Sequence, residues 1–144
     1  MVNRFIALLG LSLTLLVGRG FTANFDAANF DADDFKAARK EAEQGDINAA
    51  LALGMMYYSG EGTPQNYEEA VKWYRRAADK GNATAQNNLG LMYLNGQGVA
   101  LNLFEAVRLI RSAAEKGNSK AQMNLGQFFA DGRGVNRNYN DALF

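Results

Sequence analysis

Few residues in this chain could carry out chemistry on a substrate. The sequence has no cysteine and no histidine, which removes the thiol nucleophile, the thiolate metal site, the commonest general base and the commonest metal ligand. The serines beyond residue 20 are Ser59, Ser112 and Ser119, and none begins a Ser-x-x-Lys motif. We therefore expect a non-enzymatic protein with no catalytic residues and no cofactor, and hydrolysis of cell-wall material or of a β-lactam is the least favoured function.

The carboxylates also lack an arrangement suited to catalysis or metal binding. Glu68 and Glu69 are adjacent, so on a helix their side chains diverge by about 100° instead of facing one substrate. Four aspartates lie near the start of the chain, namely Asp26, Asp31, Asp33 and Asp34. Their spacing fails the EF-hand pattern, which also needs a turning glycine and a terminal glutamate. We expect no metal site here but an acidic lead-in to a helix that starts near Asp33, where negative charge is favourable.

Three Gly-x-Gly sequences, at residues 60–62, 96–98 and 132–134, could be taken for phosphate-binding loops. A phosphate cradle needs a strand before the glycines and a helix N-terminus directly after them, and the flanking sequence offers neither. Paired glycines also permit positive φ and a sharp chain reversal. We therefore interpret these segments as turns between helices.

The elements that would position any site belong to an internal repeat. Gly45, Gly81 and Gly117 are 36 residues apart, and the residues between them coincide at many positions when the segments are superimposed. A fixed period of about 20–50 residues is typical of solenoids and repeat arrays. The sequence predicts a leading half-repeat helix at 34–45, repeats at 46–81 and 82–117, and a truncated repeat at 118–144.

Each repeat is expected to form two helices, here called helix A and helix B. Helix A begins after an N-cap residue (Asp46, Asn82 or Asn118). Its apolar positions are Ala49, Leu53, Met56 and Tyr57, then Ala85, Leu89, Met92 and Tyr93, then Ala121, Leu125, Phe128 and Phe129. This spacing predicts one buried face. The mid-helix glycines Gly54, Gly90 and Gly126 each cost about 1 kcal/mol against alanine, so we expect a partner helix to approach them closely.

Helix B is expected to begin near Asn66, Asn102 and Asn138 and to end before a left-handed glycine. Its predicted buried face is rich in alanine and carries Trp73 and Tyr74 in the first copy and Leu109 and Ile110 in the second. Arg39–Glu43, Arg75–Asp79 and Arg111–Glu115 are spaced i, i+4, and we expect them to lie on a solvated face. The third helix B is cut short, so the C-terminal edge is expected to be the weak end of the array.

The N-terminus resembles a secretory signal. Arg4 precedes an uncharged, mostly apolar run from Phe5 to Gly18, which fits the apolar region of a signal peptide and is shorter than a transmembrane helix. We expect residues 1–20 to be removed, with cleavage after Gly20, and 21–33 to form the acidic lead-in. An uncleaved N-terminal membrane anchor is the alternative. With residues 1–20 removed, we expect a periplasmic or secreted location.

These motifs resemble one family. Ala-x-x-x-Leu-Gly-x-x-Tyr, as in Ala85 to Tyr93, is followed by Gly-x-Gly-Val and by Glu-Ala-Val with a later Ala-Ala pair, as in Glu105 to Ala114. The pattern resembles the Sel-one-like repeat (SLR), a relative of the tetratricopeptide repeat, over about residues 34–144. The resemblance implies an all-α, α/α right-handed superhelical solenoid of antiparallel helix pairs that scaffolds protein complexes and, in bacteria, is often exported. Cysteine-rich relatives have been described as penicillin-binding or β-lactamase-like, and the absence of cysteine puts that activity in doubt here.

The resemblance also implies where a partner would bind, because helix A lines the inner surface of tetratricopeptide-like superhelices. Helix A positions that differ between copies and lie off the buried stripe are free to bind a ligand. The candidate residues are Leu51, Met55, Tyr58, Asn87, Asn88, Leu91, Met123, Asn124 and Gln127. Asn and Gln can bond a peptide backbone, and Met, Leu and Tyr offer adaptable apolar contact. Packing against the next helix A is the alternative role.

We therefore expect an exported scaffold that binds a protein or peptide. With equal numbers of basic and acidic residues, 15 of each, we expect no nucleic-acid partner. A structural fragment that self-associates through its open C-terminal edge is the alternative function. Phe104 stands where the other copies have Glu68 and Asn140; we favour its packing under the loop, and an exposed contact point is the alternative.

Overall fold

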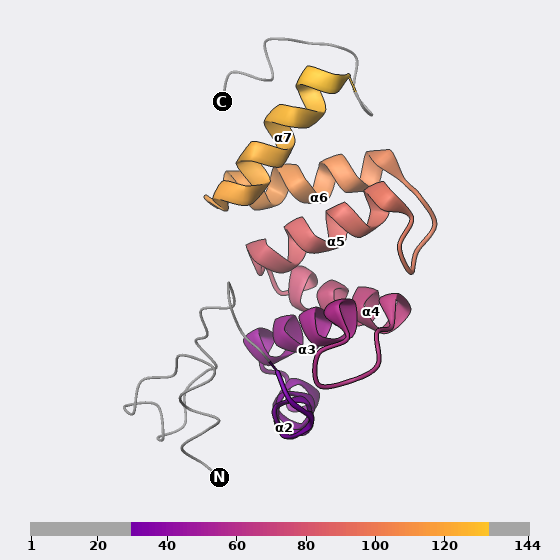
Figure 1. Ribbon diagram of the computed structural model, residues 1–144. Helices are drawn as coiled ribbons and strands as arrows, with labels where there is room; N and C mark the ends of the chain where they lie inside the picture. The colour runs from indigo at the N-terminus through magenta and orange to yellow at the C-terminus, as the bar shows by residue number, and fades with distance from the viewer. Residues whose placement is uncertain (1–29, 133–144) are drawn as a thin grey trace. The chain divides into compact units, whose positions relative to one another are not determined.

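The computed structural model describes residues 30–132, and every regular element in that range is an α-helix (Figure 1). The helices are α2 (Ala32–Glu43), α3 (Ile47–Ser59), α4 (Tyr67–Asp79), α5 (Ala83–Asn95), α6 (Leu103–Glu115) and α7 (Ser119–Asp131). The predicted all-α fold of helix pairs is confirmed. The predicted signal segment, Asp26 and Asn138 lie outside the described residues.

The chain divides into two compact units, Met1–Trp73 and Tyr74–Phe144, with α4 crossing the boundary. In the first unit α2 packs against α3. In the second unit α5 packs against α6, α6 packs against α7, and α5 also contacts α7. Figure 1 shows α5 and α6 running in opposite directions beside each other. The predicted helix A and helix B of the second repeat are therefore α5 and α6.

Acidic residues at the start of α2 cap that helix. The Asp31 carboxylate accepts hydrogen bonds from the backbone N–H groups of Asp33 (2.8 Å) and Asp34 (3.0 Å), and the Asp34 carboxylate accepts one from the Asp31 N–H (3.0 Å). This reciprocal pair is a capping box. Burial raises the pKa of the Asp34 carboxyl, against the hydrogen bond from the Asp31 backbone, which lowers it. The helix starts at Ala32, slightly earlier than predicted, because Asp31 and not Asp33 is its N-cap.

The Gly-Asn pairs end one helix and begin the next, as predicted. At the end of α6, the Gly117 N–H donates to Ala114 O (2.9 Å) and the Asn118 N–H donates to Ala113 O (3.1 Å). This Schellman motif needs a left-handed residue, and Gly117 has φ of 86°. The Asn118 side chain then accepts from the Ala121 N–H (2.9 Å) and caps α7. Because one helix ends and the next begins within two residues, the chain turns sharply here and α7 packs against α6.

The other predicted caps are confirmed as well. Side-chain oxygens accept hydrogen bonds from the backbone N–H three residues on at Asp46, Asn66, Asn82 and Asn102. Each such cap stabilises a helix by about 1 kcal/mol. Gly60, Gly96 and Gly132 end the three A helices in the left-handed conformation. The first glycine of each Gly-x-Gly sequence therefore terminates a helix. The loop up to Asn102 closes with a hydrogen bond from the Asn102 N–H to Tyr93 O (3.0 Å).

The core of the second unit lies between α5, α6 and α7. Val107, Ile110, Ala113, Ala114, Ala121 and Phe128 are buried together, with Leu91, Leu94 and Leu125 packed against them. Gly90 faces this core: a Cβ placed there would lie 2.7 Å from Ile110 Cγ1 and 3.1 Å from Ala106 O. The predicted close approach of helix B to the mid-helix glycine is confirmed at Gly90. At Gly126 a Cβ would meet no described atom within 4 Å.

A buried polar network joins α5 and α6 and was not predicted. The Gln86 side chain donates to Ala78 O (3.3 Å), and its carbonyl oxygen accepts from Ser112 Oγ (3.2 Å) and Lys116 Nζ (3.1 Å). Lys116 Nζ also donates to Gly81 O (3.0 Å). A buried amide is tolerated when its donors and acceptor are paired, and this network ties the end of α4 to both helices of the next pair.

The solvated arginine face differs in part from the prediction. Arg39 pairs with Glu43 at 3.0 Å as expected. Arg75 instead donates to the Tyr93 hydroxyl (2.6 Å), and the Arg111 guanidinium lies 5.7 Å from the Phe129 ring centroid. Both arginines thus contact an aromatic side chain eighteen residues further along the chain. A guanidinium stacks favourably on an aromatic ring. The alternative, an i, i+4 ion pair in which arginine precedes the acid, is weak.

Candidate partner-binding surface

In the first unit, the candidate surface is formed by Met55 and Tyr58 of α3. Tyr58 is 38% exposed, and its ring lies 5.3 Å from that of Tyr67 in a tilted arrangement. Met55 is half-buried. Leu51, the third candidate on this helix, is only 3% exposed. The Leu51 side chain is therefore packed inside the protein and is not accessible to a partner in this conformation.

In the second unit, the candidate asparagines bond one another. Asn124 Nδ2 of α7 donates to Asn87 Oδ1 of α5 at 2.9 Å, and Asn87 Nδ2 lies 3.5 Å from Asn88 Oδ1. Asn87 is 3% exposed, and a buried amide needs such partners. We expected Asn87 to bond a peptide backbone, but its side chain is already hydrogen-bonded between the two A helices, α5 and α7. Asn88 and Asn124 remain partly exposed.

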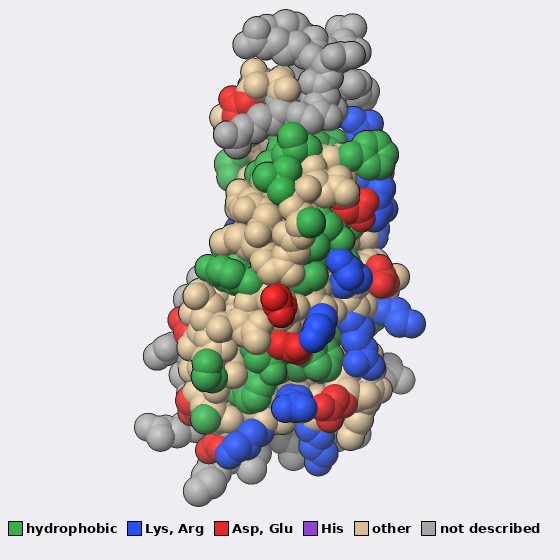
Figure 2. Space-filling view, turned by 90° about the vertical axis from the view of Figure 1, so that its right-hand side faces the viewer, with side chains coloured by type: hydrophobic (Ala, Val, Ile, Leu, Met, Phe, Trp, Pro, Cys, Tyr) green, Lys and Arg blue, Asp and Glu red, His purple; other side chains and the backbone are tan. Residues whose placement is uncertain are grey.

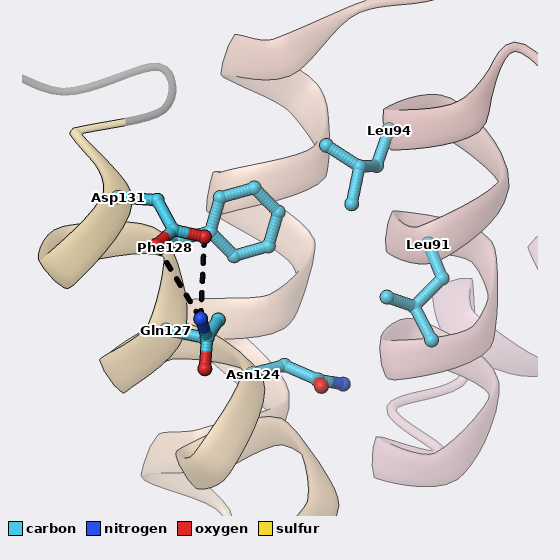
Figure 3. A pocket seen from close by; sticks show the side chains of 6 residues that line it. All are labelled: Leu91, Leu94, Asn124, Gln127, Phe128 and Asp131. Carbon is cyan, nitrogen blue, oxygen red and sulfur yellow. Dashed lines mark hydrogen bonds between the residues drawn. The ribbon is translucent and has the colours of Figure 1, made fainter.

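A pocket of about 90 Å³ opens beside these asparagines, between α5 and α7. Leu91 and Leu94 line it from α5; Asn124, Gln127, Phe128 and Asp131 line it from α7. Figure 3 shows the two leucines reaching toward the ring of Phe128 and the amide of Asn124. Three candidates predicted from the sequence, Leu91, Asn124 and Gln127, are therefore brought together here. Met123 lies on the same helix with 70% of its surface exposed.

Two lining residues, Phe128 and Asp131, were not among the candidates. The apolar stripe assigned Phe128 to the core, and it serves both roles, since it is buried in the core cluster and forms a wall of the pocket. Asp131 could have been found by comparing the repeats, because an acid stands there where the other copies have Ser59 and Asn95. Its carboxylate accepts from Gln127 Nε2 at 3.3 and 3.4 Å.

A second apolar feature lies on helix B. Phe104, at the start of α6, is 77% exposed, so the favoured prediction that it packs under the loop is wrong. The reason is helical geometry: Phe104 shares the outer face of α6 with Arg108 and Arg111, whereas Ala106 and Val107 face the core. Arg108 forms a two-point ion pair with Glu105 (2.6 and 2.8 Å), and this hydrogen bonding lowers the pKa of the Glu105 carboxyl.

The charged side chains of residues 30–132 form no metal cluster, and those on the face shown in Figure 2 are mixed in sign. On the face shown in Figure 2, basic and acidic side chains stand beside each other instead of gathering by sign. Within residues 30–132, no three His, Cys, Asp or Glu side chains are placed to hold a metal ion. No helix of that same range has the length and apolar character needed to cross a membrane.

Comparison with known proteins identifies the repeat. The sequence profile of the Sel1 repeat matches residues 47–82, 83–118 and 119–144. The chain belongs to the Sel1 repeat family. The family resemblance seen in the sequence is thereby confirmed, and each matched Sel1 repeat begins one residue after the boundary predicted from the glycines.

Solved Sel1 repeat structures share the fold. A Sel1 repeat protein from Oxalobacter formigenes is 38% identical, with a TM-score of 0.73, over 78% of this chain and 46% of that one. The protective antigen c5321 of uropathogenic Escherichia coli strains, which has an SLR fold, is 39% identical, with a TM-score of 0.76, over 96% of this chain and 28% of that one. Cysteine-rich protein B of Helicobacter pylori is 25% identical, with a TM-score of 0.61, over 65% of this chain and 70% of that one.

The Sel1 repeats described here thus span less than half the length of the first two of these proteins. No curated protein matches the sequence. Unlike the Helicobacter pylori protein, whose name describes it as cysteine-rich, this chain has no cysteine.

Proposed function

We propose that this Sel1 repeat chain is an exported, non-enzymatic scaffold that binds a protein or peptide partner through its A helices. The observation that carries the proposal is the pocket between α5 and α7, which is lined by positions that differ from repeat to repeat. The exposed Met123 belongs to the same helix as its lining residues Asn124 and Gln127. Packing explains residues that every copy shares. It does not require an apolar pocket with a polar rim at positions where the copies diverge.

Binding through the A helices can be tested with the full chain and a displayed library of random peptides. A selected peptide should bind saturably, and the double substitution Met123→Ala, Gln127→Ala should weaken it about tenfold or more, as for the central contacts of an interface. The matched control is Phe104→Ala, which removes an exposed apolar side chain from α6 and should leave affinity unchanged. Both exposed sites should tolerate substitution, which circular dichroism melts would verify.

Two results would contradict this assignment. A library that yields no saturable binder argues against a peptide-binding scaffold. A binder that is lost in Phe104→Ala and unaffected by the double substitution would move the site to helix B. Asn124→Ala is a poor probe, because it also leaves the buried Asn87 carbonyl without the hydrogen bond from Asn124.

Export is supported by the apolar run from Phe5 to Gly18 after Arg4. When the full chain is expressed in a bacterium with a periplasm, we expect the protein in the periplasmic or extracellular fraction, without residues 1–20. Intact-mass measurement would show the cleavage. As a control, Leu8→Arg with Leu15→Arg should interrupt the apolar run and keep the protein uncleaved in the cytoplasm. Full-length protein recovered from the membrane fraction would support an anchor instead.

A further inference from the structure

The apolar part of the α5–α7 pocket limits what can enter it. Leu91, Leu94 and Phe128 form its walls, and its volume is about 90 Å³. The pocket is small and open to solvent, and its apolar walls come from both α5 and α7. A branched aliphatic side chain that enters it would contact both walls. Burial of such a side chain against leucine and phenylalanine is favourable because it removes apolar surface from water.

The polar rim of the pocket presents acceptors. The amide nitrogen of Asn124 donates to Asn87, and that of Gln127 donates to Asp131. Figure 3 shows the Gln127 amide with its nitrogen turned toward Asp131 and its oxygen turned away. What remains for a ligand at the rim is therefore the Asp131 carboxylate, two amide oxygens that can accept further bonds, and the second N–H of the Asn124 amide. Acceptors outnumber donors there, so a ligand rich in donors complements the rim.

The charge of Asp131 further restricts the kind of ligand that suits the pocket. Asp131 is the one charged side chain among the residues that line the pocket, and it is exposed. The corresponding residues of the other copies, Ser59 and Asn95, are uncharged. A cationic donor beside the aliphatic group would satisfy both the carboxylate and the amide oxygens, and hydrogen bonds between ions are stronger than those between neutral groups.

We infer that the α5–α7 pocket selects an extended peptide segment in which an aliphatic residue is followed, two positions later, by lysine or arginine. Residues i and i+2 of an extended chain point to the same side. The aliphatic side chain enters between Leu91, Leu94 and Phe128, and the cation lies against Asp131. This inference rests on the proposed function and names the chemistry of the partner that it requires.

Short capped peptides test the inference on the full chain. The probe is Ac-Gly-Ser-Leu-Ser-Lys-Ser-Gly-NH2, compared with one peptide in which Glu replaces Lys and one in which Gly replaces Leu. Titrations followed by NMR should move the amide signals of Leu91, Leu94 and Phe128. At about 20 mM salt the Lys peptide should bind about threefold to fivefold more tightly than the Glu peptide, the range of an exposed ion pair, and about 500 mM salt should reduce the difference. The Gly peptide should not move these signals.

Substitutions at Asp131 separate charge recognition from simple apolar binding. Asp131→Asn should abolish the preference for Lys over Glu, and Asp131→Lys should reverse it. The matched control is Glu115→Gln, which neutralises an exposed carboxylate on α6 and should leave the preference intact. Equal binding of the Lys and Glu peptides, or a preference that survives Asp131→Lys, overturns the inference.

The two proposals fail in distinguishable ways. If library-selected peptides bind through Met123 and Gln127 while the leucine peptides leave the pocket signals unmoved, the inference about the pocket is wrong and the scaffold proposal stands. If neither set of peptides binds, both are wrong. If the Leu peptides bind without regard to charge, the inference is overturned and the scaffold proposal stands.

Discussion

Gly90→Ala is expected to destabilise the protein by about 1–3 kcal/mol, the usual range for overpacking a core. The new Cβ would lie 2.7 Å from Ile110 Cγ1 and 3.1 Å from the Ala106 carbonyl oxygen. Ile110 is fully buried, so its side chain has little room to move, and a carbonyl oxygen in a helix has less. Alanine is the better helix former by about 1 kcal/mol, which offsets only part of this penalty. Urea unfolding would measure the change through the midpoint at constant slope.

Gly126→Ala is the matched control, since Gly126 occupies the same place in the next repeat. No described atom lies within 4 Å of a Cβ at that position. The helix-propensity term then acts alone, and this variant should gain up to about 1 kcal/mol of unfolding free energy. Opposite signs at two equivalent glycines would show that packing, and not helix propensity, requires glycine at position 90. Equal losses at both would contradict this account.

The order and limits of the helices could be predicted because local chemistry determines them. An Asn or Asp N-cap and a left-handed glycine act within a few residues, and the repeat shows each signal several times. Asn118, for example, accepts from the Ala121 N–H in the structure as its position predicts. The same holds for Gly90, where repetition of a residue that weakens a helix indicated a close contact that the structure contains.

The candidate surface was harder to predict because hydrogen bonds and packing between helices determine which of its side chains are free. Asn87 could have bonded a ligand, but α7 places Asn124 within 2.9 Å of it. The sequence gives no measure of that separation. Asp131 and Phe128 were missed because residues that form a pocket wall can belong equally to the core pattern or to the end of a helix. Phe104 was misassigned because an aromatic side chain was expected to avoid water, although scattered apolar residues are common on protein surfaces.

Ile110→Ala is expected to reduce the unfolding free energy by about 2–5 kcal/mol, and Ile110→Val by about 0.5–1.5 kcal/mol, the ranges for buried isoleucine. Ile110 is fully buried in the cluster with Val107, Ala113 and Phe128. Alanines surround it on α6, and they cannot extend to fill the space that truncation leaves. Thermal and urea unfolding would measure both losses. A loss under about 1 kcal/mol for the alanine variant would mean that the core collapses around the site.

Gly90→Ala and Ile110→Ala can be combined in a double-mutant cycle. Ile110→Ala removes Cγ1 and Cδ1, which are two of the three nearest atoms to a Cβ at Gly90. In that background Gly90→Ala should fill part of the new space and become neutral or stabilising, so the coupling free energy should be about 1–3 kcal/mol, in the range seen for residues in contact. Gly126→Ala combined with Ile110→Ala is the control cycle and should be additive within about 0.5 kcal/mol, as for residues without a shared contact. Additivity in the Gly90 cycle would show that the α5–α6 contact does not determine the effect of that glycine.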